Sequence, residues 1–314
     1  MSTTDPTPDD AYVTDEARGE HWAMLLGDSC ERLAEVDTDS VGLTVCSPPF
    51  AQVYNYSPSP RDLSNTRDRA EFLEHYGFII REQLRVTMPG RVAAVHVADI
   101  TTQKVLHDVI GISDFTGDVI RAFLDAGWIY DGRITIDKDP QAQAIRTKSQ
   151  SLLFITMDRD ASMLRPAMPD YLLKFRKPGD NPVPIRQNDG HRTRVTREEW
   201  ISWARPVWLD IRETNTLNAR VAREDADERH IAPLQLDFIE RAIRLWSNPG
   251  ETVLSPFGGI GSEPYCAVKL DRYGFGIELK ASYWATACDN LRKLEREMSA
   301  DTLFSALDDE GAGE

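Results

Sequence analysis

The chain has 314 residues, enough for one large α/β domain with an insertion or for two small domains. No apolar run approaches the roughly 18 residues of a membrane span, and the N-terminus lacks the apolar segment of a signal peptide. The four cysteines lie far apart without C-x-x-C spacing, which favours buried free thiols over a metal centre or a disulfide framework. We therefore expect a soluble intracellular protein with no membrane partner and no metal.

The formal net charge of −15 is unevenly distributed. Residues 1–20 carry six acids against one arginine, and residues 301–314 carry five acids and no base. Both ends read as solvated, poorly ordered acidic tails. Residues 174–223 instead hold eleven Lys or Arg and six Asp or Glu. Such a local excess of positive charge can bind a polyanion, although a solvated charged surface is the alternative.

The pattern of apolar residues predicts strands that alternate with helices. A helical stretch is expected before Trp22, and a buried strand at 42–46 ends abruptly at Pro48 and Pro49. Further elements are expected as helices at 69–86, 115–126 and 234–246 and as strands at 91–98, 133–137 and 152–157. Residues 158–228 read as a loop-rich insertion. This order favours a mostly parallel sheet with helices on both faces.

A glycine-rich stretch near the C-terminus has the layout of half a nucleotide-binding fold. A short apolar strand at 252–255 enters a turn with Gly258, Gly259 and Gly261, and a helix and a second strand follow. Glycines let a ligand touch the backbone of the turn, and Glu278 at the end of the second strand can accept hydrogen bonds from a ribose. An ordinary strand-turn-helix with glycines used for packing is the alternative.

A second motif, Ser47-Pro-Pro-Phe50, stands at the end of the strand at 42–46. Alone it is weak, but together with Phe257-Gly-Gly-Ile-Gly261 it makes the chain resemble the amino-group DNA methyltransferases of the permuted β type. The resemblance covers roughly residues 22–296 and includes Gly27-Asp28 and Gly276-Ile-Glu-Leu279. The last third is especially similar to site-specific methyltransferases of bacteriophages.

The resemblance implies a Rossmann-like fold that binds S-adenosylmethionine. Its implied cofactor contacts are Asp28 near the adenine, Glu278 on the ribose, and Ser255, Phe257, Gly258, Gly259 and Gly261 around the methionine end. Its implied catalytic residues are Ser47, Pro48, Pro49 and Phe50, with Phe50 stacking on a flipped-out base of duplex DNA. His96 lies on a predicted strand and is expected to be a core or rim histidine.

The charge distribution and the resemblance together suggest a division of the chain. Residues 1–20 and 299–314 would be acidic tails, 21–157 the catalytic half, 229–298 the cofactor-binding half, and 158–228 a basic candidate DNA-recognition region. We expect Arg192, Arg194 and Arg197 to contact DNA. The protein would act in the cytoplasm of a bacterial or phage-infected cell. The oligomeric state stays open, a homodimer included.

The sequence leaves the reaction partly open. Two departures from the pattern of the resembled family concern the cofactor site. Members of that family usually have an acid where this chain has Ser255. In the segment after His230, Ala232 and Leu234 replace the family's usual Thr and Lys. In the family that the chain resembles, a serine at position 47 favours cytosine N4 as the acceptor, with adenine N6 as the alternative. A non-catalytic DNA-binding module and a nicotinamide-dependent oxidoreductase are further alternatives.

Overall fold

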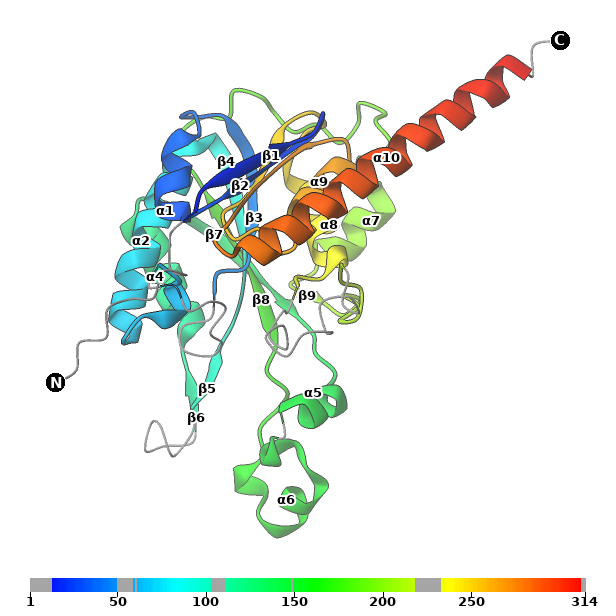
Figure 1. Ribbon diagram of the computed structural model, residues 1–314. Helices are drawn as coiled ribbons and strands as arrows, with labels where there is room; N and C mark the ends of the chain where they lie inside the picture. The colour runs from blue at the N-terminus through cyan, green and yellow to red at the C-terminus, as the bar shows by residue number, and fades with distance from the viewer. Residues whose placement is uncertain are drawn as a thin grey trace.

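The computed structural model describes residues 13–49, 59, 61–102, 111–147, 149–217 and 233–311. Within these ranges a nine-stranded sheet has the order β1-β2-β11-β10-β3-β4-β8-β7-β9 (Figure 1). Its strands are β1 Asp15–Arg18, β2 Trp22–Leu26, β3 Val41–Cys46, β4 Thr87–Ala98, β7 Ile129–Ile136, β8 Asp170–Arg176, β9 Val207–Trp208, β10 Thr252–Ser255 and β11 Tyr273–Glu278. A separate pair is formed by β5 Ile100–Thr102 and β6 Gly111–Ser113.

The sheet is mostly parallel, as the sequence predicts. Strands β2, β11, β10, β3 and β4 run in one direction, while β8 is antiparallel to both β4 and β7. From β3 the chain proceeds to β4 on one side, and from β10 it proceeds to β11 on the other. The boundary between β3 and β10 is therefore a topological switch point, where ligands of open α/β sheets bind at the carboxyl ends of the strands.

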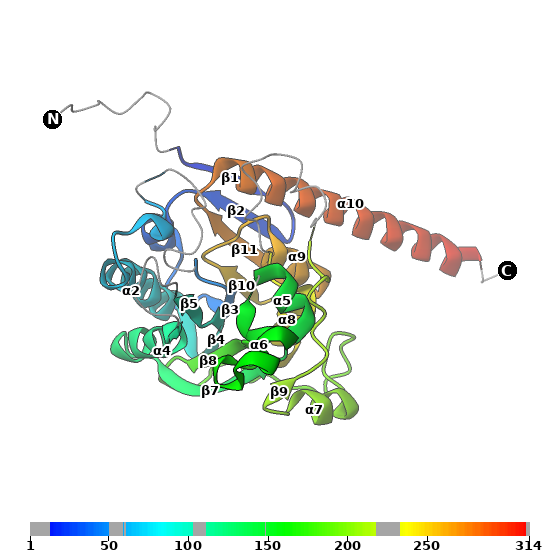
Figure 2. The ribbon, with the colours of Figure 1, turned by 90° about the horizontal axis from the view of Figure 1, so that it is seen from below.

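Helices cover both faces of this sheet (Figures 1 and 2). The described helices are α1 Ser29–Arg32, α2 Arg69–Val86, α4 Phe115–Asp125, α5 Pro140–Thr147, α6 Phe154–Arg159, α7 Arg197–Trp203, α8 Leu236–Trp246, α9 Ser262–Lys269 and α10 Ala281–Gly311. On one face Phe72 and Tyr76 of α2 pack with Phe123 of α4, and on the other Phe238 of α8 packs with Cys266 of α9. The fully buried side chains of these helices make the two layers of the core.

Local sequence explains where the long helices begin. Asp68 precedes α2 and its side chain accepts a hydrogen bond from the backbone N–H of Glu71, and Asp114 caps α4 in the same way through Gly117. Such caps satisfy backbone donors that lack an intrahelical partner. The predicted helix at 69–86 is confirmed, and the predicted strands at 42–46 and 91–98 lie within β3 and β4.

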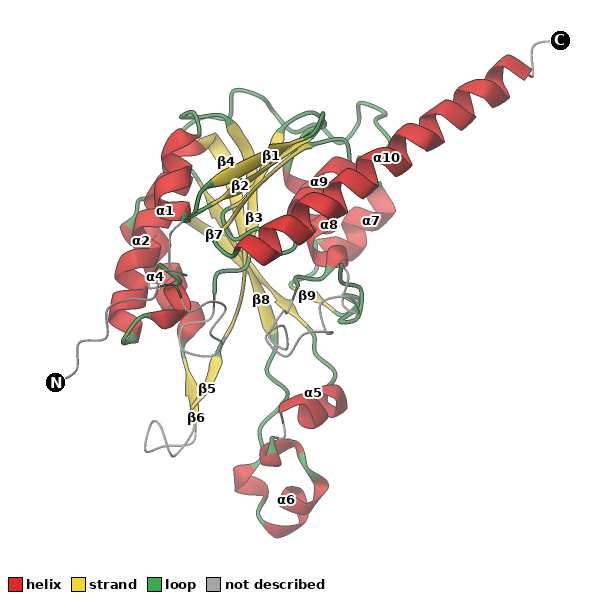
Figure 3. Cartoon of the chain, in the orientation of Figure 1, coloured by secondary structure: helices red, strands yellow, loops and turns green. Residues whose placement is uncertain are grey.

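Three sequence-based expectations are wrong. The stretch before Trp22 is not helical, since residues 15–18 form β1, which pairs antiparallel with β2. Residues 152–157 are not a strand, because this short apolar run lies on an excursion between β7 and β8 and forms α6 (Figure 3). The described part of the predicted insertion, residues 158–217, is not separate from the main sheet, since its strand β8 lies between β4 and β7.

The described part of the predicted C-terminal tail, residues 299–311, belongs to α10. Helix α10 continues to Gly311 and extends away from the sheet (Figure 1). Its first turns pack on the domain, where Ala287 and Leu291 cluster with Trp22 of β2. The cysteines at positions 30, 46, 266 and 288 are free thiols. In the described ranges, no helix has the length and apolarity needed to cross a membrane.

Candidate functional site

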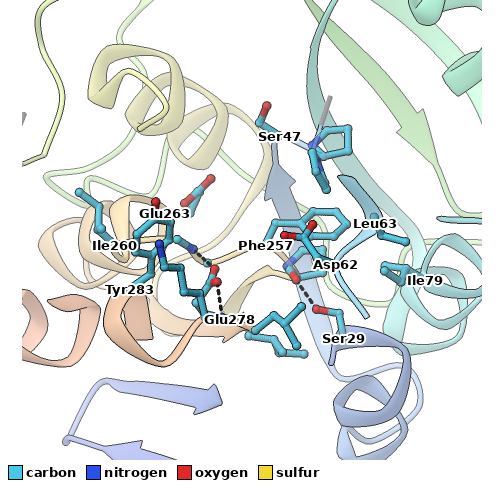
Figure 4. Close-up of a pocket in the computed structure, with 18 of the residues that line it drawn as sticks. Ser29, Ser47, Asp62, Leu63, Ile79, Phe257, Ile260, Glu263, Glu278 and Tyr283 are labelled. Atoms are coloured by element: carbon cyan, nitrogen blue, oxygen red, sulfur yellow. Dashed lines mark hydrogen bonds between the residues drawn. The ribbon is translucent and has the colours of Figure 1, made fainter. Parts of the chain in front are cut away.

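A pocket of about 200 Å³ lies at the carboxyl ends of β3, β10 and β11 (Figure 4). It brings together the proline motif after β3 and the glycine turn after β10, which are some 200 residues apart in the sequence. The lining includes the predicted residues Asp28, Ser47, Pro48, Pro49, Phe257, Gly258, Gly259 and Glu278. Phe50 lies outside the described residues. The two motifs therefore line one pocket, as the resemblance of the chain to amino-group DNA methyltransferases implies.

The glycines of the turn serve different purposes. Gly259 has φ +52° and faces open space, so the backbone here is accessible from the pocket. A Cβ on Gly258 would lie 3.0 Å from Met24 Cε and 3.2 Å from the Ile277 carbonyl oxygen. Gly261 has φ +89° and is the N-cap of α9, and a Cβ there would lie 3.0 Å from the Cβ of Ala287. Of these three glycines, Gly259 is the one free for close approach by a ligand.

Glu278 connects the two halves of this turn. Its Oε2 accepts a hydrogen bond from the Gly259 backbone N–H at 2.7 Å, and its Oε1 accepts one from the backbone N–H of Lys280 at 2.8 Å. Burial raises the pKa of Glu278 to about 7, against the opposing effect of these two backbone donors. Glu278 lines the pocket, and a carboxylate that accepts one hydrogen bond on each oxygen retains lone pairs for a ribose diol.

Asp28 lines the pocket and is the N-cap of α1. Its Oδ1 accepts from the backbone N–H of Cys30 at 2.9 Å, and its Oδ2 pairs with Arg61 Nη1 at 3.3 Å. The neighbouring Ser29 hydroxyl donates to the carbonyl oxygen of Pro256. These contacts tie α1 to the turn after β10, so the sequence pair Gly27-Asp28 has a fixed place beside the glycine turn.

Ser47 lies directly after β3, where Pro48 and Pro49 end the strand. Its Oγ is 3.1 Å from Nδ1 of His96, which projects from β4. His96 is 7% exposed and packs edge-on against the ring of Phe238, so it lies on the rim of the core as expected. Its hydrogen bond with Ser47 was not predicted from the sequence. A single strand pattern does not show which residue of the neighbouring strand faces it.

Comparison with known proteins identifies the family of this chain. A family model for N6 and N4 methyltransferases, described as DNA methylase, matches residues 41–289. The chain belongs to this family. A type II methyltransferase of Methanocaldococcus jannaschii, M.MjaI, is 24% identical over an alignment of 287 residues that covers 82% of this chain and 87% of that protein.

Two solved structures share the fold of this DNA methylase. TTHA0409 of Thermus thermophilus has a TM-score of 0.64 at 23% identity, and the match covers 86% of this chain and 93% of that one. The cytosine-N4-specific PvuII DNA methyltransferase has a TM-score of 0.61 at 16% identity, with 88% and 91% covered. The Rossmann-like methyltransferase fold predicted from the sequence is thereby confirmed.

The cofactor of this DNA methylase is S-adenosylmethionine. The pocket fits it, because the accessible backbone at Gly259 and the Glu278 carboxylate lie on one side, and apolar Leu63 and Ile79 lie on the other (Figure 4). Bound there, the cofactor supplies a methyl group on a sulfonium centre. Ser255 does not line the pocket: it is fully buried at the end of β10, and its Oγ has no hydrogen-bond partner among the described residues.

Sequence reasoning missed several residues of the pocket. Glu263, in the first turn of α9, is 5% exposed, and burial raises its pKa to about 8. Its position directly after the glycine turn is the sequence feature that could have marked Glu263 as a pocket residue. Asp62 and Tyr283 also line the pocket, but nothing in their sequence surroundings marks them. No group of three His, Cys, Asp or Glu in the described ranges could hold a metal ion.

The structure does not bring the three predicted DNA-binding arginines to this pocket. Arg194 is buried, and its guanidinium binds Asp189 at 2.9 Å and Asn248 at 3.0 Å. Arg192 pairs with Asp271, just before β11, while Arg197 is exposed in the first turn of α7. Residues 248 and 271 precede the amino ends of β10 and β11, opposite the pocket. Local charge excess in a sequence does not show which charges are already paired.

Proposed function

We propose that this DNA methylase is a site-specific enzyme that transfers the methyl group of S-adenosylmethionine to cytosine N4 in duplex DNA. The observation that supports this most directly is the position of Ser47. It lines the same pocket as Gly259 and Glu278, and its hydroxyl is hydrogen-bonded to His96. A serine hydroxyl that donates to a histidine retains lone pairs that can accept a hydrogen bond from a substrate amine.

The chemistry needs acceptors more than it needs a nucleophile on the protein. The lone pair of an exocyclic amine is delocalised into the base ring, so the nitrogen attacks poorly until its N–H groups are held. The Ser47 oxygen and the Pro48 carbonyl are two such acceptors at the end of β3. The target nucleotide has to leave the duplex to reach them, and Phe50 would stack on its base.

The choice of cytosine N4 rests on Ser47 as the first residue of the proline motif. An uncharged hydroxyl at this position favours cytosine N4 in this family, whereas adenine N6 is the alternative. Both amines can use the same two acceptors, so the pocket's chemistry supports either base. The comparison with the cytosine-N4-specific PvuII enzyme concerns the fold alone at 16% identity.

We propose that the DNA lies against the carboxyl end of the sheet. The β5–β6 hairpin follows β4, and the excursion carrying α5 and α6 connects β7 to β8, so both begin where Ser47 ends β3. Figure 1 shows both projecting from this end of the domain, away from α7. A duplex placed there would present a flipped base to the pocket without crossing the sheet.

Nucleoside analysis tests the reaction. The protein is incubated with duplex DNA and S-adenosylmethionine carrying a labelled methyl group, and the digested nucleosides are separated by mass. Label in 4-methylcytosine supports the proposal. Label in 6-methyladenine would show that the acceptor is adenine N6 and not cytosine N4. Binding of DNA without label in any base would leave a non-catalytic DNA-binding module. Sequencing the same DNA by a modification-sensitive method gives the recognition site.

A further inference from the structure

A chain of hydrogen bonds runs inward from the pocket through Ser47. The Ser47 Oγ lies 3.1 Å from Nδ1 of His96, and Nε2 of His96 lies 3.0 Å from Oδ2 of Asp170. The same carboxylate oxygen lies 2.6 Å from Nζ of Lys138. These residues come from four separate places: the ends of β3 and β4, the start of β8 and the segment after β7. The antiparallel pairing of β8 with β4 and β7 brings them together.

The surrounding groups determine the protonation of Asp170 and the tautomer of His96. Burial raises the pKa of Asp170, but its interactions with His96 and Lys138, hydrogen bonds included, outweigh burial and lower it to about 2. Asp170 is therefore a carboxylate at neutral pH. An anionic oxygen opposite Nε2 favours the imidazole tautomer that carries its proton there. Nδ1 is then the acceptor for the Ser47 hydroxyl. Helix α8 contributes the uncharged ring edge of Phe238 to His96.

A purely structural role does not account for this arrangement. Lys138 is 6% exposed and His96 is 7% exposed, so both ionisable side chains are buried. Both belong to the chain of hydrogen bonds that ends at the Ser47 hydroxyl. Burying such groups costs free energy unless each is paired, and apolar residues of similar volume are often as stable in their place. Here the one end of the chain that reaches the pocket is Ser47.

Building on the proposed function, we propose that His96, held by Asp170 and Lys138, is a positioning residue that orients the Ser47 hydroxyl and takes up, through it, the proton released by the target amine. The amine nitrogen forms a bond to the methyl carbon while the carbon–sulfur bond breaks and its electron pair stays on sulfur. The nitrogen then loses an N–H proton to Ser47 Oγ as the Ser47 proton moves to Nδ1 of His96. The methylated amine is left neutral, and the imidazolium faces the Asp170 carboxylate until its proton passes to water.

Two substitutions of His96 separate orientation from proton uptake. His96→Asn keeps an oxygen that can accept from the Ser47 hydroxyl but cannot take up a proton, whereas His96→Ala keeps neither. Single-turnover methyl transfer to duplex DNA is measured from about pH 5.5 to about pH 9.5, and S-adenosylmethionine affinity is measured by calorimetry. Phe238→Leu is the matched control, because it removes the ring contact and leaves the hydrogen-bond chain.

The wild-type rate is expected to rise with pH through one inflection, and Phe238→Leu should keep that inflection. His96→Asn should lose it and fall by about tenfold or more, and His96→Ala should fall by about 100-fold. The affinity for S-adenosylmethionine should change by less than about twofold. Combining Ser47→Ala with His96→Ala should cost no more than Ser47→Ala alone, because the two residues act as one unit.

The opposite results are equally clear. Wild-type rate and inflection in both His96 variants would overturn the proposal, as would full multiplicative losses in the double variant. If the His96 variants fail to bind S-adenosylmethionine, Asp170→Asn decides: it should lower the rate and displace the inflection, and wild-type behaviour would refute the role. A wild-type protein that methylates no base would instead defeat the proposed function, without bearing on whether Ser47 and His96 are coupled.

Discussion

The Glu278 carboxylate accepts a hydrogen bond from the backbone N–H of Gly259 at 2.7 Å, which joins the end of β11 to the turn after β10. One side chain therefore shapes the glycine turn, and we expect its carboxylate to accept hydrogen bonds from the ribose of the cofactor. Its other backbone contact, with Lys280, fixes the second oxygen. Because both oxygens are placed before a ligand arrives, binding costs little reorganisation of this side chain.

Glu278→Ala should weaken S-adenosylmethionine binding by about 1–3 kcal/mol, the cost of leaving ribose hydroxyls without their acceptor. Glu278→Gln keeps one oxygen acceptor and should lose less. Isothermal calorimetry on the two variants measures the difference, with circular dichroism to establish that both are folded. Equal affinity of wild type and a folded alanine variant would remove Glu278 from the cofactor site.

Ser47→Ala should leave cofactor binding intact and lower methyl transfer by about two orders of magnitude, because the lost acceptor acts on the reacting amine. Phe50→Ala should also lower transfer, through lost stacking on the base. Single-turnover kinetics with labelled S-adenosylmethionine give both effects separately from binding. Normal turnover in both variants would show that the target nucleobase binds elsewhere on the protein.

The sequence predicted the parts of this site that depend on backbone geometry. A strand that ends in two prolines and a glycine turn before a helix leave local signals, and both lie where the pattern put them. The Ser47–His96 contact depends instead on β3 and β4 being neighbours in one register. The error at residues 152–157 has a related cause, since a short apolar run becomes a strand only where a partner edge is available.

Buried acids should make the ligand-free protein sensitive to alkaline pH. Burial raises the pKa of Glu263 to about 8 and of Glu278 to about 7, both above the ordinary value of 4.5. The folded state thus holds these protons more tightly than the unfolded chain. This contribution to stability is complete below about pH 4.5 and is lost as the pH rises through about 7 to 8.

Glu263→Gln should therefore raise the free energy of unfolding near pH 9 by on the order of a few kcal/mol and leave it nearly unchanged near pH 5. Urea denaturation at the two pH values measures the difference. The control is Glu297→Gln on the exposed face of α10, where the carboxylate lies 3.8 Å from Lys293. A gain of the same size at both pH values would show that packing, rather than titration, explains the result.

Arg194 should prove to be a structural residue. Its guanidinium binds Asp189 and Asn248 at the amino end of β10, and it is 9% exposed. Arg194→Ala should lower the free energy of unfolding by about 1–3 kcal/mol, because buried polar partners lose their hydrogen bonds. Its affinity for S-adenosylmethionine should not change. Arg197→Ala, on the exposed start of α7, should unfold at the wild-type denaturant concentration.

The salt dependence of DNA binding can locate the face that meets the duplex. Arg159 is exposed at the end of α6, on the excursion that projects from the pocket end of the sheet (Figure 1). If this excursion contacts phosphates, Arg159→Ala should reduce the slope of log affinity against log salt concentration by roughly one. Arg197→Ala, at the other end, should leave the slope unchanged. Fluorescence anisotropy with labelled duplex DNA across a salt series measures both. A smaller slope for Arg197→Ala together with a wild-type slope for Arg159→Ala would contradict this placement. It would indicate that the DNA binds the basic segment at residues 174–223, as the sequence alone suggested.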